Sequence, residues 1–255
     1  MSVKPSARVS EVFDVIQFGI ITPTYKRARF LPSFIENVRR QTYSSWTLTI
    51  VHDGPASEEI AETVSQSAMG ESRIRYLETP VHRGDMGNGP RLFGIQNIAE
   101  TMPTIQYILF WDDDNKFFPD ALANIDQAIR ETGNPDLLLV PITHKWRSLP
   151  SRGLPLRALP MGHVDTGNLC VKTDTANKHF AKSQHQSDFY HHDFYFYRSI
   201  CDDQSARVCL ANIDNIGCYD GLRFWETIRW KVWPRPLQIY DTTFMRQIRR
   251  LIPRG

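Results

Sequence analysis

The stretch that decides the fold is Tyr107-Ile108-Leu109-Phe110-Trp111-Asp112-Asp113-Asp114-Asn115. Its run of apolar and aromatic residues indicates a buried β-strand. The run ends in three adjacent carboxylates, which repel one another and cannot stay ionised at the edge of a core without a partner. Mg²⁺ or Mn²⁺ is the simplest partner, and such ions usually also hold substrate phosphates. The alternative is a solvated acidic turn in which one Asp caps the next helix.

On both sides of this stretch, short apolar strands alternate with amphipathic helices. The patterns predict strands at 18–22, 46–51, 74–77, 107–111, 136–140 and 169–171, and helices near 31–40, 57–67, 91–99 and 122–129. Pro23 is expected to stop the first strand. This alternation predicts an α/β fold in one domain, with a mostly parallel sheet flanked by helices.

Three of the predicted strands end in polar residues that could contact a ligand. These ends are Thr22 to Tyr25, His52 to Gly54, and Asp112 to Asp114. The carboxyl ends of parallel strands lie at one edge of a sheet, where ligands bind in open α/β folds. We therefore expect the three ends to converge on one crevice.

Composition and charge exclude several classes of protein. The 255 residues, 41% of them hydrophobic, suffice for a sizeable core. The four cysteines form no CxxC pair, which predicts reduced, buried thiols rather than a zinc site or a disulfide framework. No stretch has the length of a membrane span or the pattern of a signal peptide. We therefore expect a cytoplasmic protein, with peripheral membrane attachment as an alternative.

The segment 223–255 is basic and aromatic. Eight Lys and Arg residues against Glu226 and Asp241 give it a charge of +6, so the rest of the chain carries 2 − 6 = −4. Such a tail can form a surface helix over the core or lie on an anionic membrane or lipid-linked acceptor. Because the rest of the chain is acidic, we expect no nucleic-acid partner.

Four motifs together resemble the family 2-like glycosyltransferases, which have the nucleotide-sugar-binding GT-A fold. They are Ile21 to Arg27, Gln41 to Tyr43 before Trp46, Val51 to Gly54, and Trp111 to Asn115 followed by Phe118 to Asp120. Their order and spacing fit over roughly residues 17–130, and the match is looser beyond residue 140. The resemblance implies a GT-A, Rossmann-like sheet in a single domain.

The resemblance also implies how the chain is divided. Residues 1–16 would be a lead-in, 17–140 the half that binds the nucleotide-sugar donor, 141–222 the acceptor and catalytic half, and 223–255 the C-terminal tail. The implied activity is metal-dependent transfer of a sugar from a nucleotide-diphosphate donor, with UDP as the expected nucleotide. The acceptor would be a hydroxyl of a glycan or a lipid-linked molecule.

Individual positions take roles from the same resemblance. Pro23, Thr24 and Tyr25 would line the nucleotide base, and Asp53 would accept a hydrogen bond from it. Arg83 or Arg91 would meet the diphosphate or ribose. Asp112 and Asp114 form the D-x-D element, in which the last residue holds Mn²⁺ or Mg²⁺. The donor-binding set predicted in full is Pro23, Thr24, Tyr25, Arg27, Asp53, Arg83, Arg91, Asp112 and Asp113, and the metal ligands predicted are Asp114 and Asp112.

Inverting members need a carboxylate that deprotonates the acceptor. The resemblance implies Asp193 for this role, with Asp165 as the runner-up. The family usually has an acid before this Asp, whereas this chain has His192. That difference raises the alternative that His191 or His192 completes the metal shell as a neutral imidazole. In competing interpretations Asp193 caps a helix, the histidines pack in the protein, and Asp53 serves only a turn.

Two other functions remain open from the sequence. A sugar nucleotidyltransferase usually has a glycine-rich phosphate loop after its first strand, and Pro23 to Lys26 contains no glycine. A non-catalytic module that binds a nucleotide sugar or a glycan would be favoured if Asp193 and Asp165 lay far from the metal crevice. The distance between these carboxylates and the acidic strand end therefore discriminates a catalytic site from a binding site.

Overall fold

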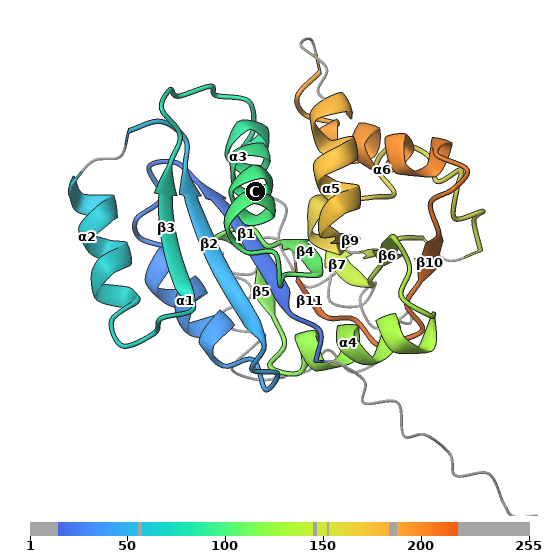
Figure 1. Ribbon diagram of the computed structural model, residues 1–255, viewed down its shortest axis with the longest axis horizontal. Coiled ribbons are helices and arrows are strands. Elements are labelled where there is room, and N and C mark those ends of the chain that lie inside the picture. The colour runs from blue at the N-terminus through green and yellow to red at the C-terminus, as the bar shows by residue number, and fades with distance from the viewer. Residues whose placement is uncertain (1–14, 56–57, 145–146, 152, 184–187, 219–255) are drawn as a thin grey trace, which may run out of the picture.

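The computed structural model describes residues 15–55, 58–144, 147–151, 153–183 and 188–218. Its main feature is a seven-stranded sheet in the order β10-β6-β9-β4-β1-β2-β3 (Figure 1). The strands are β1 (Phe18–Thr24), β2 (Trp46–His52), β3 (Ile74–Glu78), β4 (Tyr107–Phe110), β6 (Leu137–Leu139), β9 (Leu169–Lys172) and β10 (Val208–Leu210). The strands β1 to β4 are parallel, and β9 is antiparallel to both of its neighbours, β4 and β6.

A smaller four-stranded sheet has the order β5-β11-β7-β8. Its strands are β5 (Lys116–Phe117), β7 (Ile142–His144), β8 (Arg147–Leu149) and β11 (Gly217–Cys218). The sequence did not predict this sheet, because strands of two or three residues are too short to show a hydrophobic period. Strand β5 follows the acidic stretch directly and pairs with β11, so the small sheet holds the C-terminal end of that stretch.

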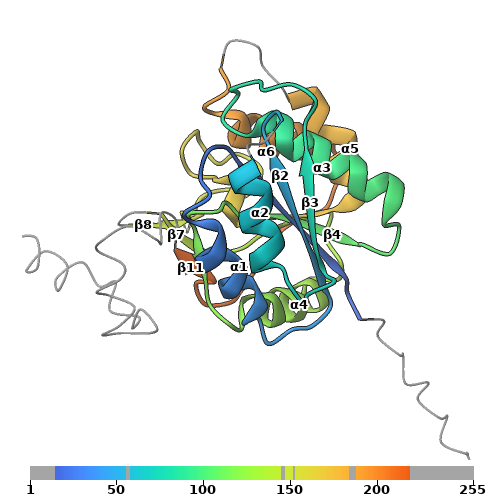
Figure 2. The same ribbon diagram turned by 90° about the vertical axis from the view of Figure 1, so that its left-hand side faces the viewer.

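Helices cover both faces of the large sheet (Figure 2). The α-helices are α1 (Leu31–Arg39), α2 (Glu58–Ser67), α3 (Asn88–Thr101), α4 (Ala121–Glu131), α5 (Thr173–Phe180) and α6 (His192–Asp202). One core cluster joins the sheet to α1, α2, α4 and the small sheet, and a second joins it to α3, α5 and α6. The predicted single-domain α/β fold with a mostly parallel sheet is confirmed.

The prediction that Pro23 ends the first strand was wrong. Strand β1 continues to Thr24, and Pro23 pairs in register with Val51 of β2. Neighbouring β4 ends at Phe110, opposite Ile21. The Trp111 N–H still donates to the Ile21 carbonyl, so an N–H at position 23 would face Trp111. The Trp111 carbonyl accepts from Thr22 Oγ1 at 2.7 Å instead, so the N–H that Pro23 lacks leaves no acceptor unpaired.

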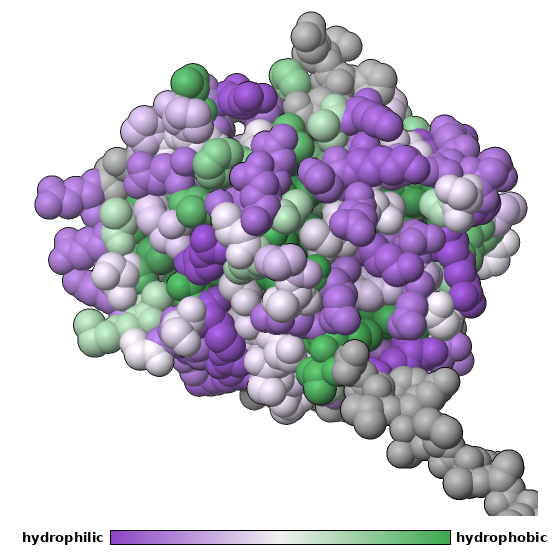
Figure 3. All heavy atoms as spheres, viewed as in Figure 1, coloured by the Kyte–Doolittle hydropathy of each residue, from purple (hydrophilic) through white to green (hydrophobic). Residues whose placement is uncertain are grey.

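Other sequence expectations have mixed outcomes. All four cysteines are free; three are buried, and Cys209 is partly exposed. In the part of the chain that the structure describes, no helix is long and apolar enough to cross a membrane. Hydrophilic residues cover most of the face formed by α3, α5 and α6 (Figure 3). The tail at 223–255 lies outside the described residues, so its expected roles stay predictions.

Candidate active site

The carboxyl ends of β1, β2 and β4 meet, as their parallel order predicts. The hydroxyl of Thr24 donates to Asp113 Oδ2 at 2.7 Å, and the backbone N–H of Asp53 donates to the carbonyl of Thr24 at 3.0 Å. Two residues earlier in β1, Thr22 Oγ1 donates to the carbonyl of Trp111 at 2.7 Å. Two of the three strand ends are thus bonded directly to β1, which forms the floor of one site.

Two arginines pair with the three adjacent carboxylates. Arg27 donates through Nη1 to Asp113 Oδ1 at 2.9 Å and to Asp114 Oδ2 at 2.8 Å. Arg91 of α3 donates through Nη2 to Asp112 Oδ1 at 2.5 Å. These five side chains carry a formal charge of −1. Asp113 is 1% exposed, so the alternative of a solvated acidic turn does not hold for this residue.

Asp113 has a different environment from its two neighbours. Burial raises the pKa of its carboxyl to about 6, although the bonds from Thr24 and Arg27 lower it. Both of its oxygens already accept hydrogen bonds, from Thr24 and from Arg27. Asp113 therefore ties the end of β4 to β1, a structural role in addition to its predicted place in the donor site.

Asp53 binds the loop that follows β3. Its carboxylate accepts hydrogen bonds from the backbone N–H groups of Arg83 and Gly84, both at 3.0 Å, and lies 2.9 Å from Nδ1 of His82. A side chain on Gly54 would meet the backbone of His82 at 2.8 Å, and Gly54 has a φ of +89°. The Asp53-Gly54 pair therefore holds the loop at 82–84, and a role of Asp53 in base binding stays a prediction.

His82 is a site residue that the sequence prediction missed. Its ring stacks on Tyr25 with centroids 4.1 Å apart and planes 9° apart. Tyr25 is 37% exposed and borders the end of β1, next to His52. The sequence feature that could have indicated His82 was its position immediately before Arg83 and Gly84, which were assigned to the predicted donor site and its glycine loop. The stacked rings of Tyr25 and His82 lie beside the Asp53 carboxylate, and aromatic faces next to a carboxylate suit the binding of a nucleobase.

The predicted cationic residues lie at the start of α3. The exposed Arg83 side chain crosses Gly89, where an added Cβ would lie 2.8 Å from Arg83 Cδ. Arg91 is 5% exposed and also donates to the carbonyl of Met86 at 3.0 Å. A helix amino end with two arginines favours binding of an anion.

Asp193 and Asp165 are the two carboxyls predicted as candidate bases, and burial and the charges of Arg91 and Asp112 affect the pKa of both. Burial raises the pKa of Asp193 to about 6 and that of Asp165 to about 7. Asp193 Oδ1 accepts from the backbone N–H of Phe194 at 2.7 Å, and Asp165 Oδ1 accepts from that of Gly167 at 2.8 Å. The second contact caps a short 3-10 helix at Thr166–Asn168. A Cβ placed on Gly167 would lie 3.2 Å from Asp165 Oδ1 and 3.5 Å from Asn115 Nδ2, so Asp165 lies near the end of the acidic stretch. Asp193 lies in the first turn of α6.

The two histidines have partners within their own half of the chain. His191 Nδ1 lies 2.9 Å from Asp188 Oδ1. The buried ring of His192 packs against Phe180 with centroids 4.4 Å apart, and its Nε2 lies 3.2 Å from Ser183 Oγ. The packing interpretation therefore describes His192, while a metal role for His191 stays a prediction.

The carboxylates of Asp112 and Asp114 are suitable ligands for a hard divalent cation, but both are bonded to arginines in this structure. Asp112 and Asp114 supply carboxylate oxygens, the ligand type that Mg²⁺ and Mn²⁺ prefer. Asp114 is 9% exposed and keeps some contact with solvent. Among the described residues no group of three or more His, Cys, Asp or Glu side chains is arranged to hold a metal ion. Arg27 and Arg91 hold the carboxylates instead.

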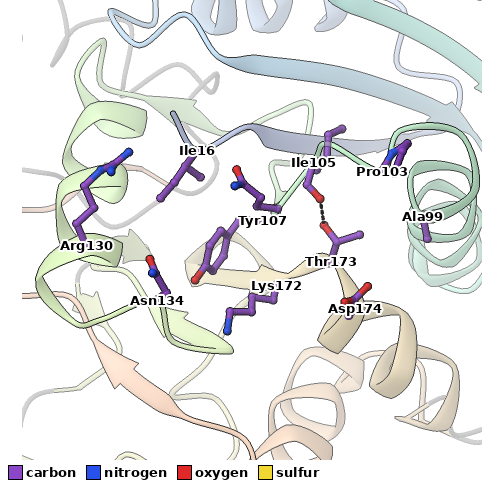
Figure 4. Close-up of a pocket in the computed structure, with 11 residues that line it drawn as sticks. Ile16, Ala99, Pro103, Ile105, Tyr107, Arg130, Asn134, Lys172, Thr173 and Asp174 are labelled. Atoms are coloured by element: carbon purple, nitrogen blue, oxygen red, sulfur yellow. Dashed lines mark hydrogen bonds between the residues drawn. The ribbon is translucent and has the colours of Figure 1, made fainter. Parts of the chain in front are cut away.

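A separate pocket of about 540 Å³ lies at the opposite end of the strands (Figure 4). Ile105 and Tyr107, at the beginning of β4, line it together with Lys172 at the end of β9. Both of its basic residues are paired: Lys172 Nζ lies 3.0 Å from Asp136 Oδ1, and Arg130 Nε lies 2.9 Å from Asp126 Oδ2. This pocket is remote from the acidic strand end, and we assign it no part in the site.

Comparisons with known proteins agree with this geometry. WcaA of Escherichia coli strain K12, named as a colanic acid biosynthesis glycosyl transferase, is 30% identical over 106 residues, which are 41% of this chain and 35% of WcaA. Protein CgeD of Bacillus subtilis strain 168 is 30% identical over 109 residues, 43% of this chain and 25% of CgeD. The matches thus span about a third or less of the length of these relatives.

Solved structures show the same fold. A crystal structure of Staphylococcus aureus TarS residues 1–349 in complex with UDP superposes with a TM-score of 0.60 and 14% identity, over 80% of this chain and 60% of that one. The family model described as glycosyl transferase family 2 matches residues 19–209, three quarters of the chain. The converging strand ends, the acidic stretch and this match show that the chain belongs to glycosyl transferase family 2.

Proposed function

We propose that this chain transfers a sugar from a UDP-sugar to an acceptor hydroxyl, with inversion at the anomeric carbon. The observation that carries the proposal is the position of two further carboxyls beside the predicted donor residues. Asp165 Oδ1 and Asn115 Nδ2 lie 3.2 and 3.5 Å from the position of a Cβ on Gly167. Asp193 lies in the first turn of α6, and the segment before this helix is bonded to Asn88 at the start of α3. A binding module would need the donor residues alone. A base beside the donor site is what a transferase needs in addition.

The donor would bind along the carboxyl ends of β1, β2 and β4. The base would lie by Tyr25, His82 and Asp53, where an aromatic face and a carboxylate are adjacent. Arg83 and the amino end of α3 would meet the diphosphate. UDP is the expected nucleotide because the TarS structure of the same fold holds UDP.

Asp114 would hold a divalent cation, with Asp112 as a second oxygen ligand. When bound, Mn²⁺ or Mg²⁺ stabilises the negative charge that develops on a departing diphosphate. Arg91 would remain on Asp112 and keep that carboxylate in place, since it is buried and bonded to the carbonyl of Met86. His191 as a further ligand stays a prediction.

Asp193 would act as the base. The acceptor oxygen attacks the anomeric carbon from the side opposite the diphosphate, and its proton passes to the Asp193 carboxylate. The bond between the anomeric carbon and the diphosphate oxygen breaks, and UDP leaves with the electron pair. This single displacement inverts the configuration. Asp165 stays the runner-up for the base.

The acceptor would approach over the segment before α6. Asn88 Nδ2 donates to the carbonyl of Phe189 at 3.0 Å, which joins this segment to the start of α3. The side chain of Tyr190 is 72% exposed, a position suited to contact with a sugar ring. A glycan or a lipid-linked acceptor is proposed, with peripheral membrane contact through residues 223–255 as the means of reaching the latter.

The donor assignment is tested by calorimetric titration with UDP, with and without Mn²⁺, on the wild type and on Asp114→Ala. We expect Mn²⁺ to strengthen UDP binding in the wild type and to have little effect in the variant. Binding of UDP that ignores both the metal and the substitution would remove the metal role. Absence of UDP binding in every case would favour another nucleotide or the non-catalytic alternative.

A further inference from the structure

Arg27 and Arg91, the two arginines on the acidic stretch, differ in how firmly they are held. The Arg91 side chain is 6% exposed, projects from α3 and binds both Asp112 and the carbonyl of Met86. The Arg27 side chain is 46% exposed and comes from the loop after β1. Its guanidinium group donates hydrogen bonds to Asp113 and Asp114. Arg91 is therefore a fixed part of the site, whereas Arg27 can leave it without unpacking a core.

Arg27 occupies the position of a cation between two carboxylates. A single nitrogen, Nη1, lies 2.9 Å from Asp113 Oδ1 and 2.8 Å from Asp114 Oδ2. Asp114 is the carboxylate assigned to the metal above. A divalent cation bound to Asp114 at about 2.1 Å would lie next to the guanidinium group, and two positive charges that close repel strongly.

The loop that carries Arg27 has an unusual backbone. Lys26, the preceding residue, has a φ of +53°, in the left-handed region that side chains other than glycine rarely adopt. Such a conformation costs energy and persists only when surrounding contacts offset the cost. The two bonds from Arg27 to the carboxylates are contacts of this kind. Loss of these bonds would remove contacts that help to hold Lys26 in this conformation.

We propose that Arg27 is a movable counter-ion that takes the metal position in the donor-free protein, so that Arg27 and the divalent cation exclude each other. This inference rests on the proposed function, because it takes Asp114 as the metal ligand. It follows that the free protein binds Mn²⁺ weakly. A nucleoside diphosphate strengthens metal binding in two ways, by supplying oxygen ligands and by giving the released guanidinium an anionic partner.

The test is Mn²⁺ binding by the nucleotide-free protein, followed by the electron paramagnetic resonance signal of free Mn²⁺. Arg27→Gln should bind Mn²⁺ at least tenfold more tightly than the wild type, because the competing charge is gone. Arg29→Gln is the matched control: Arg29 is an exposed arginine two residues along the same loop, over the ring of Phe30. It should change the affinity by less than twofold. Arg27→Lys keeps the charge and should stay near the wild type.

Two further measurements separate the possible failures. Arg27→Gln combined with Asp114→Asn should lose the gain, which locates the new affinity at Asp114. Unchanged or weaker Mn²⁺ binding in Arg27→Gln, in a protein whose thermal unfolding matches the wild type, would overturn the inference. So would an equal gain in Arg29→Gln. UDP binding by the wild type reports on the proposed function independently, so the donor site can stand if Arg27 proves to be no counter-ion.

Discussion

The three aspartates that follow β4 and the pair Asp165 and Asp193 have different kinds of hydrogen-bond partners. Asp112, Asp113 and Asp114 bind arginine side chains, and Asp53 binds His82 and backbone N–H groups. Asp165 and Asp193 instead accept their hydrogen bonds from backbone N–H groups. Burial raises the pKa of both into the range in which a carboxyl can exchange protons near neutrality.

Aspartate side chains can therefore serve two purposes in a single site. Pairing with a cation favours the charged form of a carboxylate and suits it to holding ligands or loops, although burial still raises the pKa of Asp113 to about 6. A carboxylate in a partly buried, weakly paired environment holds a proton more readily and is suited to proton transfer. Substitutions of Asp165 or Asp193 should therefore affect proton transfer, whereas substitutions at the donor site should affect nucleotide binding.

The largest effect is expected for Asp193→Asn. The amide keeps the shape of the carboxyl but cannot accept the acceptor's proton, so release of UDP from the donor should slow by about 10³-fold. The rate of UDP release under single-turnover conditions measures this loss. Asp165→Asn serves as the matched control and should lose much less. A greater loss for Asp165→Asn would exchange the roles of the two residues.

Asp53→Ala should weaken UDP binding by about tenfold, a loss comparable to one hydrogen bond to a charged group. The carboxylate would be lost both to the base and to the loop at His82. His82→Ala, tested by the same calorimetric titration, separates these contributions because it removes the ring stacked on Tyr25 and leaves the carboxylate in place. Unaltered UDP affinity in Asp53→Ala would exclude this carboxylate from the donor site.

The activity should depend on pH through Asp193. Its pKa is raised to about 6, and the base works in its deprotonated form. The value of kcat/KM should therefore be constant above about pH 7 and fall about tenfold per pH unit well below pH 6. A profile measured from pH 5 to 8.5 tests this, with UDP affinity followed over the same range. A flat profile would contradict proton transfer to this carboxyl.

The smallest effect concerns stability. Burial raises the pKa of Asp165 to about 7, so the native state binds this proton more tightly than the unfolded chain does. That contribution is complete below about pH 4 and is lost as the pH rises through about 7. Asp165→Asn should remove this slope and stabilise the metal-free protein at pH 8 by about 1 kcal/mol, a reduced figure because the carboxyl is partly exposed. Urea unfolding at pH 5 and pH 8 measures the difference.

The sequence predicts those features that depend on local pattern and on parallel topology. The strand from Tyr107, the helices at their hydrophobic periods and the meeting of Thr24 with the acidic stretch all follow from such rules. Features that depend on particular loop conformations do not. The pairing of Arg27 with Asp114 joins residues 87 positions apart through a loop whose shape no pattern specifies. The prediction that Pro23 ends β1 failed because a proline is tolerated in a strand when its missing N–H leaves no acceptor unpaired. That condition depends on the neighbouring strand and cannot be read from the sequence.

The second half of the chain was harder to predict for a physical reason. Strands β7, β8 and β11 have two or three residues each, and tertiary packing rather than propensity determines them. His192 looked like a candidate ligand in the sequence because imidazoles serve equally as ligands and as packed aromatic rings. Only its contacts with Phe180 and Ser183 distinguish these uses.

The central claim is that the donor is held by one set of aspartates and the proton by another. Calorimetric titration of Asp193→Asn with UDP and Mn²⁺ tests it most directly. The account predicts an affinity within about twofold of the wild type, since Asp193 takes no part in holding the nucleotide. A loss of tenfold or more, in a variant that unfolds at the wild-type temperature, would contradict the separation and make Asp193 a donor ligand.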